Sequence, residues 1–215
     1  MATDYTWRPK GLPIKAQGVS IDPILAFKHF VLPGLGDVNW IEDSSKVSDT
    51  TMSKREWIGL IIHSIALQDL TGNELQVAKM LENDDGGLVR GNSEAVYVEQ
   101  TLATYRDKRY KTLLEAVEGQ VKAKSSRGQN YADNRHLIVF CNMNGDMQED
   151  ELAKIVSRGS FNIVTIFGFE GKSRHYLAYV FDRDKPDAPI HKCAISEAEM
   201  IQAANDLPEK SKLAE

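Results

Sequence analysis

Residues 95–105 read AVYVEQTLATY, and polar and apolar side chains alternate along this stretch. Every second residue of an extended chain shares a face, so Glu99 and Thr101 fall on the face opposite Val96 and Val98. This period of two is typical of a β-strand whose two faces have different surroundings. The stretch therefore predicts a strand that carries one acidic side chain, Glu99, near its middle.

The segments that follow this strand alternate between helical and extended patterns. Residues 111–127 place apolar side chains at helical spacing, and residues 136–141 read HLIVFC, a continuous apolar run typical of a strand covered on both faces. After residue 105 the sequence predicts a helix at 111–127, a strand at 136–141, a helix at 149–158, strands at 163–169 and 175–181 joined by a hairpin at 170–174, and a helix that begins near Ser196.

The segments before the strand begin with a helix. Ser53-Lys54-Arg55-Glu56 has the form of a capping box, in which the serine oxygen and the glutamate carboxylate accept hydrogen bonds from otherwise unpaired backbone donors. Apolar residues continue at mostly helical spacing to a stop at Thr71-Gly72. We expect a strand within 75–81 and a turn at Asp84-Asp85-Gly86-Gly87, because Asp-Gly is a favoured turn pair.

This order of elements predicts an α/β fold with a mixed central sheet flanked by helices. Residues 1–52 are punctuated by glycine and proline and are interpreted as an irregular N-terminal arm. The α/β core is expected to span residues 53–182, with a helical C-terminal extension at 183–215.

Composition excludes several classes of protein. The 215 residues are 42% hydrophobic with a net charge of −5, which is ordinary for a globular chain and unlike a disordered one. The longest apolar segment, residues 58–67, is far shorter than the ~20 residues that cross a bilayer, so we expect a cytoplasmic protein with no membrane partner. The sequence lacks zinc-ligand spacing, a phosphate-binding glycine loop, a dinucleotide fingerprint and a Gly-x-Ser-x-Gly motif.

The turn acids and the strand acid form the one chemical constellation above background. Two carboxylates about 4 Å apart repel each other, and a divalent cation reverses this repulsion. Mg²⁺ prefers carboxylate and water oxygens and keeps waters for a phosphate substrate, so Mg²⁺ or Mn²⁺ is the expected cofactor. The sequence predicts that an aspartate of this turn, Asp84 or Asp85, holds the metal together with Glu99.

The order helix, strand, Asp-Gly-Gly turn, strand Val96–Thr101, helix and buried strand resembles the restriction-endonuclease-like PD-(D/E)xK nuclease superfamily. The resemblance covers about residues 53–170 and implies a restriction-endonuclease-like core. It also implies that Asp85 and Glu99 hold the metal and that Glu56 matches the helix glutamate of some members.

The family's lysine, two positions after the second acid, helps to orient the attacking water. Thr101 stands there in this sequence, and threonine supplies no positive charge. The superfamily sometimes supplies a displaced lysine from the following helix, for which Lys122 is the preferred candidate and Lys111 the second. An inactive descendant that still binds nucleic acid is the alternative.

Residues 106–127 contain seven basic and three acidic residues in a chain that is acidic overall. Such a segment can hold a phosphate backbone, and Tyr105 and Tyr110 within or beside it can stack on bases. A solvated helix face is the simpler explanation of the same charges. The expected nucleic-acid-binding residues are Arg106, Lys108, Arg109, Lys111, Lys124 and Arg127.

The remaining candidates have structural explanations beside the functional ones. Glu56 serves as the capping glutamate, His63 lies among isoleucines as core histidines do, and Cys141 ends a buried strand. The loop 142–146 follows a strand, where open α/β sheets bind ligands.

From the acids, the basic segment and the resemblance, we expect a metal-dependent nuclease-like protein that hydrolyses DNA or RNA. The alternative is a catalytically inactive binding or oligomeric interaction module, with homo-oligomers as one form.

Overall fold

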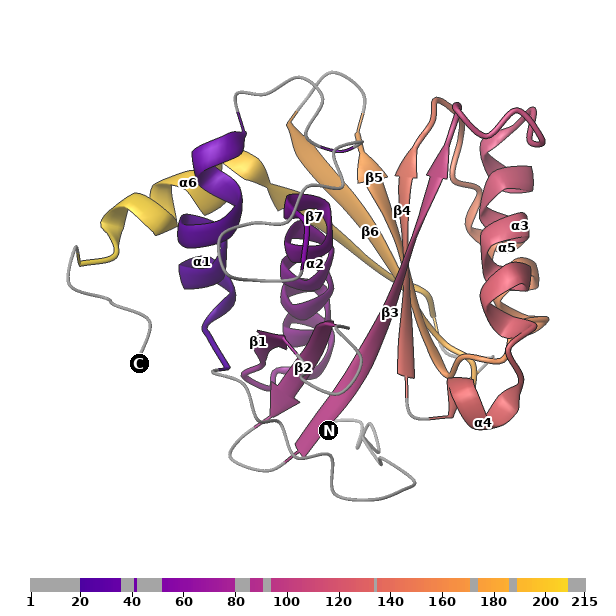
Figure 1. The fold of residues 1–215 in the computed structure, drawn as a ribbon, viewed down its shortest axis with the longest axis horizontal. Coiled ribbons are helices and arrows are strands. Elements are labelled where there is room, and N and C mark those ends of the chain that lie inside the picture. The colour runs from indigo at the N-terminus through magenta and orange to yellow at the C-terminus, as the bar shows by residue number, and fades with distance from the viewer. Residues whose placement is uncertain are drawn as a thin grey trace. The chain divides into compact units, whose positions relative to one another are not determined.

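The computed structural model describes residues 20–35, 41, 52–79, 86–90, 94–133, 135–170, 174–185 and 189–208 (Figure 1). The chain divides into two compact units, one formed by residues 1–98 and 195–215 and the other by residues 99–194. Each unit has its own helices. The strands β3 and β7 contribute residues to both units.

Among the described residues, the first unit contains a short mixed helix, two longer helices and two complete strands. α1 (Pro23–Ala26) continues into a π-helical turn (Phe27–Val31) and a 3-10 turn (Leu32–Gly34). The other elements are α2 (Lys54–Thr71), β1 (Gln76–Lys79), β2 (Gly86–Arg90), the first half of β3 (Glu94–Thr104) and α6 (Glu197–Asp206).

The second unit alternates helices and strands. It contains the second half of β3, α3 (Leu113–Ser125), α4 (Gln129–Ala132), β4 (Arg135–Asn142), α5 (Glu149–Ser157), β5 (Ile163–Phe169), β6 (His175–Asp182) and most of β7 (His191–Ser196). Figure 1 shows α3 and α5 side by side along this part of the sheet. The predicted helices at 111–127 and 149–158 and the predicted strands at 136–141, 163–169 and 175–181 are confirmed.

Within the described residues, seven strands are neighbours in chain order from β1 to β7. β4 and β5 are parallel, whereas β1 with β2, β2 with β3 and β5 with β6 are antiparallel. A parallel pair needs a crossover connection, and α5 supplies it between β4 and β5. The expected α/β class with a mixed sheet is confirmed at this level.

The capping box at the start of α2 is present. The Ser53 hydroxyl accepts from the Glu56 amide at 3.3 Å, and the Ser53 amide donates to Glu56 Oε2 at 2.6 Å. α2 ends at Gly72, whose φ of 69° is a left-handed conformation that favours glycine. Both boundaries follow the signals in the sequence.

The turn expected at residues 84–87 is wrong for its two glycines. Gly86 and Gly87 lie in β2, paired with Val98 and Tyr97, while Asp84 and Asp85 lie outside the described residues. A Cβ atom on Gly86 would come within 2.5 Å of Leu60 on α2. Glycine is therefore used here for close packing of the helix on the strand, which the local sequence does not reveal.

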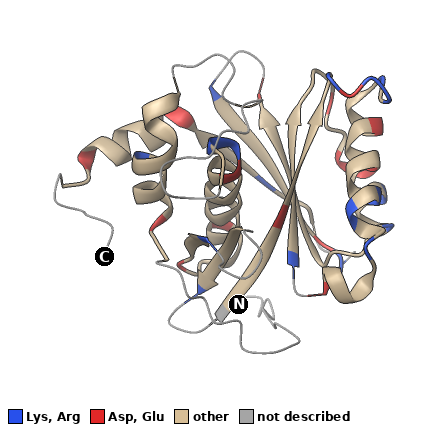
Figure 2. Cartoon of the chain, viewed as in Figure 1, with Lys and Arg blue, Asp and Glu red and all other residues tan. Residues whose placement is uncertain are grey.

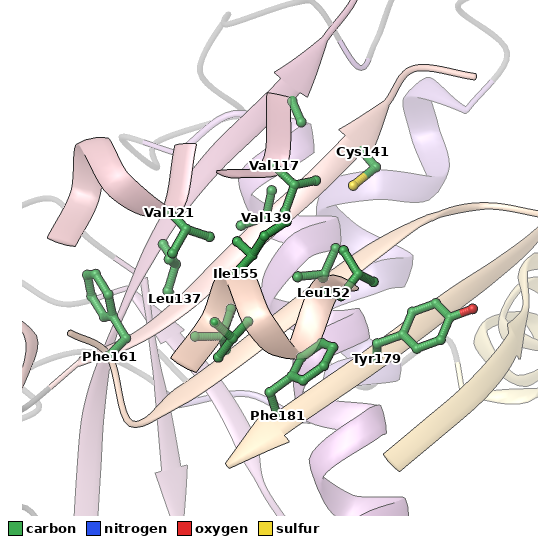
Figure 3. Close-up of a cluster of buried hydrophobic side chains, with 14 of the residues drawn as sticks. Val117, Val121, Leu137, Val139, Cys141, Leu152, Ile155, Phe161, Tyr179 and Phe181 are labelled. Carbon is green, nitrogen blue, oxygen red and sulfur yellow. The ribbon is translucent and has the colours of Figure 1, made fainter. Parts of the chain in front are cut away.

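A hydrophobic core fills the second unit (Figure 3). Val117 and Val121 of α3 and Leu152 and Ile155 of α5 point toward Leu137 and other side chains of the sheet. β4 is buried along both faces between its end residues, as its continuous apolar run predicts. The core also includes Ala103, Leu113, Ala116, Ala132, Val139, Cys141, Val156, Phe161, Val164, Ile166, Tyr179 and Phe181.

Candidate functional site

Glu99 lies on the face of β3 that α3 covers. Thr101 and Ala103 follow it at the two-residue period of a strand, and Ala103 belongs to the core beneath α3. This position buries the Glu99 side chain, which is 8% exposed. A carboxylate removed from water needs hydrogen bonds or a counter-charge, so its partners decide what it can do.

Both carboxylate oxygens of Glu99 are engaged. The Lys124 ammonium donates to Oε1, and the Tyr131 hydroxyl donates to Oε2. Arg127 lies 3.5 Å from Oε2 and also donates to the Tyr131 hydroxyl at 2.6 Å. We call these four residues, Glu99, Lys124, Arg127 and Tyr131, the Glu99 cluster.

The structure brings Lys124 to Glu99, whereas the sequence favoured Lys122. An α-helix turns about 100° per residue, so Lys124 shares a face with Val117 and Val121, seven and three positions earlier. Those valines are buried in the core, and Lys122 is exposed. Lys124 could thus have been identified from its helical spacing to the buried residues Val117 and Val121 of α3.

Thr101, two positions after Glu99, faces the same helix. Its hydroxyl donates to Gln120 Oε1 at 2.5 Å. Gln120 lies one helical turn before Lys124, so two polar pairs connect β3 with α3. Neither Gln120 nor Tyr131 was a sequence candidate, because no local pattern singles them out.

The environment lowers the pKa of Glu99. Burial alone would raise it, but hydrogen bonds from Lys124 and Tyr131 and the charges of Lys124 and Arg127 outweigh burial. Burial and the hydrogen bond to Glu99 raise the pKa of Tyr131 to about 12, so its phenol keeps its proton at neutral pH. The Glu99 cluster therefore holds one negative and two positive charges at neutral pH.

The lowered pKa predicts a pH-dependent contribution of Glu99 to stability. Ionised Glu99 stabilises the fold above its unfolded pKa, and this contribution is lost as the pH falls through the lower folded pKa. The gap in free energy of unfolding between wild type and E99Q should therefore narrow as the pH falls below about 4.5. Urea denaturation across the acid range measures it, with the exposed Glu118→Gln as control. A gap that stays constant would contradict the assignment.

The other predicted acids are placed differently. Asp84 and Asp85 lie outside the described residues, so their approach to Glu99 stays a prediction. Glu56 Oε2 accepts from the Ser53 amide and hydroxyl at 2.6 and 2.8 Å. The capping role of Glu56 is thus present, and its role as a helix acid of a nuclease stays a prediction.

Basic residues lie along the β3–α3 loop and α3 (Figure 2). Arg106, Lys108 and Lys111 are exposed. Arg109 donates two hydrogen bonds to Asp107, at 2.8 and 2.6 Å, which lowers the pKa of Asp107 and neutralises part of the loop's charge.

The two tyrosines of this loop differ in exposure. Tyr105 is 63% exposed, so its ring is accessible to a base. Tyr110 is partly buried and rests on Gly119, where a Cβ atom would meet its hydroxyl at 2.2 Å. This contact explains a glycine in the middle of a helix, and it gives Tyr110 a packing role.

The remaining candidates fit their structural explanations. Cys141 is buried in the core, and burial raises the pKa of its thiol to about 12, so it is not an activated nucleophile. His63 is fully buried in α2. Asp146 in the loop after β4 is exposed.

The described side chains around Glu99 do not by themselves fit a divalent cation. They supply a single carboxylate, its oxygens already accept hydrogen bonds, and Lys124 and Arg127 add positive charge. Mg²⁺ needs more oxygen ligands than this set provides. The Glu99 cluster instead holds the Lys124 ammonium and the Arg127 guanidinium in place beside β3.

None of the described helices is long and apolar enough to cross a membrane. Comparison of the chain with protein-family models, with curated proteins and with solved structures finds no match. The fold and the Glu99 cluster are therefore the basis for any functional conclusion.

Proposed function

We propose that this chain is a metal-dependent nuclease-like protein that acts on the phosphodiester backbone of DNA or RNA. One observation carries the proposal: the ammonium of Lys124 reaches Glu99 from α3. In the resembling superfamily an amine accompanies the second acid, and here Thr101 leaves that place to a residue of the following helix. The order α2, three strands, α3 and β4 also agrees with a restriction-endonuclease-like core.

Asp85 is the acid to test first, because the resemblance assigns it to the metal together with Glu99. Mg²⁺ or Mn²⁺ bound with these carboxylates would supply a Lewis acid for phosphate.

The residues of the chain itself have separate tasks in this proposal. Lys124 places a positive charge beside the reacting phosphate, where it stabilises developing negative charge. Glu99 holds Lys124 in position. Arg127 and the exposed Arg106, Lys108 and Lys111 bind backbone phosphates and add salt-dependent affinity.

The proposal predicts loss of cleavage on removal of either acid. E99Q and D85N should each cut a mixture of DNA and RNA at least about tenfold more slowly than wild type in Mg²⁺ or Mn²⁺. The exposed Glu118→Gln on α3 is the matched control and should cut at the wild-type rate. Equal residual activity in wild type, E99Q and D85N would refute the hydrolytic mechanism.

Lysine variants identify the amine. K124M should lose cleavage, and T101K added to K124M should restore part of it by returning the amine to the strand. K122M decides between the two helix lysines: loss with K122M but not with K124M would reject Lys124. Circular dichroism of each variant separates loss of folding from loss of chemistry.

A second candidate function is a nuclease-like protein that binds nucleic acid without cutting it. Three hydrogen bonds favour it: Lys124 and Tyr131 each donate to an oxygen of Glu99, and Thr101 donates to Gln120. This candidate predicts oligonucleotide binding that persists in E99Q and no heat on titration with millimolar Mg²⁺ or Mn²⁺. An oligomeric interaction module predicts neither oligonucleotide binding nor cleavage.

A further inference from the structure

Two arginines flank Tyr131 in the second unit. The Arg127 guanidinium carbon lies 5.0 Å from the centre of the Tyr131 ring, and that of Arg135 lies 4.5 Å from it. Arg127 follows α3, Tyr131 lies in α4 and Arg135 begins β4. The turn between α3 and α4 passes through Gly128 at a φ of 95°, a conformation that favours glycine. The local fold thus gathers three residues from consecutive elements.

These arginines and the Glu99 cluster together have an excess of positive charge. Lys124, Arg127 and Arg135 carry three positive charges, and Glu99 carries one negative charge. The phenol of Tyr131 stays neutral because its pKa is raised to about 12. The group therefore has a net charge of +2.

The charged side chains of this group differ in how far they are exposed to solvent. The Glu99 side chain is 8% exposed and that of Lys124 19%, whereas the side chain of Arg127 is 51% exposed. Tyr131 and Arg135 are of intermediate exposure. The negative charge is thus buried while positive charge faces solvent, an arrangement that attracts an anion.

The arginines are held before any ligand arrives. Arg127 donates to the Tyr131 hydroxyl at 2.6 Å, and Tyr131 in turn packs edge-on against the buried Phe161. Each guanidinium rests against the Tyr131 ring, and a guanidinium can donate to two oxygens of one phosphate. Such preorganisation reduces the entropy cost of binding.

We propose that Arg127, Arg135 and Tyr131, which lie beside the Lys124–Glu99 pair, form a binding site for a terminal phosphate, the phosphomonoester at the end of a nucleic-acid strand. A phosphomonoester carries close to two negative charges at neutral pH and so matches the net charge of +2, whereas an internal phosphodiester carries one. That the phosphate belongs to a nucleic acid rests on the proposed function; the phosphate chemistry of the site does not.

Strand-end preference tests this site. Fluorescence anisotropy compares one labelled single-stranded oligonucleotide with a 5′-phosphate, a 3′-phosphate or hydroxyls at both ends. Wild type should bind one phosphorylated form about tenfold more tightly than the hydroxyl form. R127Q and R135Q should lose this preference, and the exposed Arg158→Gln, which removes the same charge from the end of α5, should keep it.

Thermal unfolding with inorganic phosphate or a nucleoside monophosphate separates the site from the nucleic acid. At a concentration tenfold above Kd, either ligand should raise the Tm of wild type and R158Q by about 3 °C and that of R135Q by less than about 1 °C. Comparison of variants at equal phosphate removes the general effect of the salt.

The results distinguish this inference from the proposed function. Phosphate stabilisation that depends on Arg135, together with absent cleavage and absent oligonucleotide binding, supports the phosphate site and rejects the nuclease-like function. Equal binding of all three oligonucleotides, together with equal Tm shifts in wild type and R135Q, overturns the phosphate site even if cleavage is found.

Discussion

Replacing Lys124 with methionine is expected to lower the free energy of unfolding by about 2–3 kcal/mol. The substitution keeps the volume of the aliphatic stem but leaves the Glu99 carboxylate buried with one strong partner fewer. A buried charge without its counter-ion is costly because it cannot recover the hydration that it lost on folding. Urea denaturation at neutral pH measures the change.

Two companion variants make this expectation specific. K122M removes the same charge from the exposed face of α3 and should change stability by less than about 0.5 kcal/mol. The double variant E99Q/K124M should be more stable than K124M by about 1 kcal/mol, since glutamine needs no counter-ion and still accepts from Tyr131. A double variant that is less stable than K124M would show that the ion pair with Glu99 is not the cause.

Truncation of Phe161 to alanine is expected to cost about 3–5 kcal/mol. Phe161 is fully buried in the core of residues 99–194, and its removal leaves a space that neighbouring side chains can fill only in part. Phe161 also lies 6.3 Å, centre to centre, from the ring of Tyr131 in an edge-on arrangement. The loss therefore extends to the residue that anchors Arg127.

The conservative change Phe161→Leu separates these two effects. Leucine fills most of the space and should cost about 1 kcal/mol, but it removes the aromatic contact with Tyr131. F161L should therefore retain most of the stability of wild type while losing part of the phosphate-induced rise in Tm. If F161A were no less stable than F161L, the core position of Phe161 would be contradicted.

The sequence predicts those elements whose pattern is local. Alternation in residues 95–105 gives β3, the capping box at Ser53 gives the start of α2, and the unbroken apolar run at 136–141 gives β4. Each of these patterns reflects a period or a hydrogen bond within a few residues. That is why these elements could be predicted without knowledge of their neighbours.

Predictions from the sequence are wrong or missing where the role of a residue depends on a contact with a residue far away in the chain. Gly86 and Gly87 look like a turn, but they pair with β3, and Leu60 on α2 leaves no room for a Cβ atom on Gly86. Lys122 and Lys124 are two lysines of the same helical turn, and only the direction of the buried side of α3 makes Lys124 the partner of Glu99. Tyr131 was missed because its role depends on how α4 returns toward β3.

The pairs Glu99 with Lys124 and Thr101 with Gln120 also fix how far α3 can slide along β3. Two strand residues advance about 6.6 Å, and four helix residues advance about 6 Å, so both pairs meet at once when helix and strand run in opposite directions. A shift of the helix by a single position would separate both pairs together, whereas aliphatic contacts would merely exchange neighbours. The two polar pairs thereby favour one register of α3 on β3 over its neighbours.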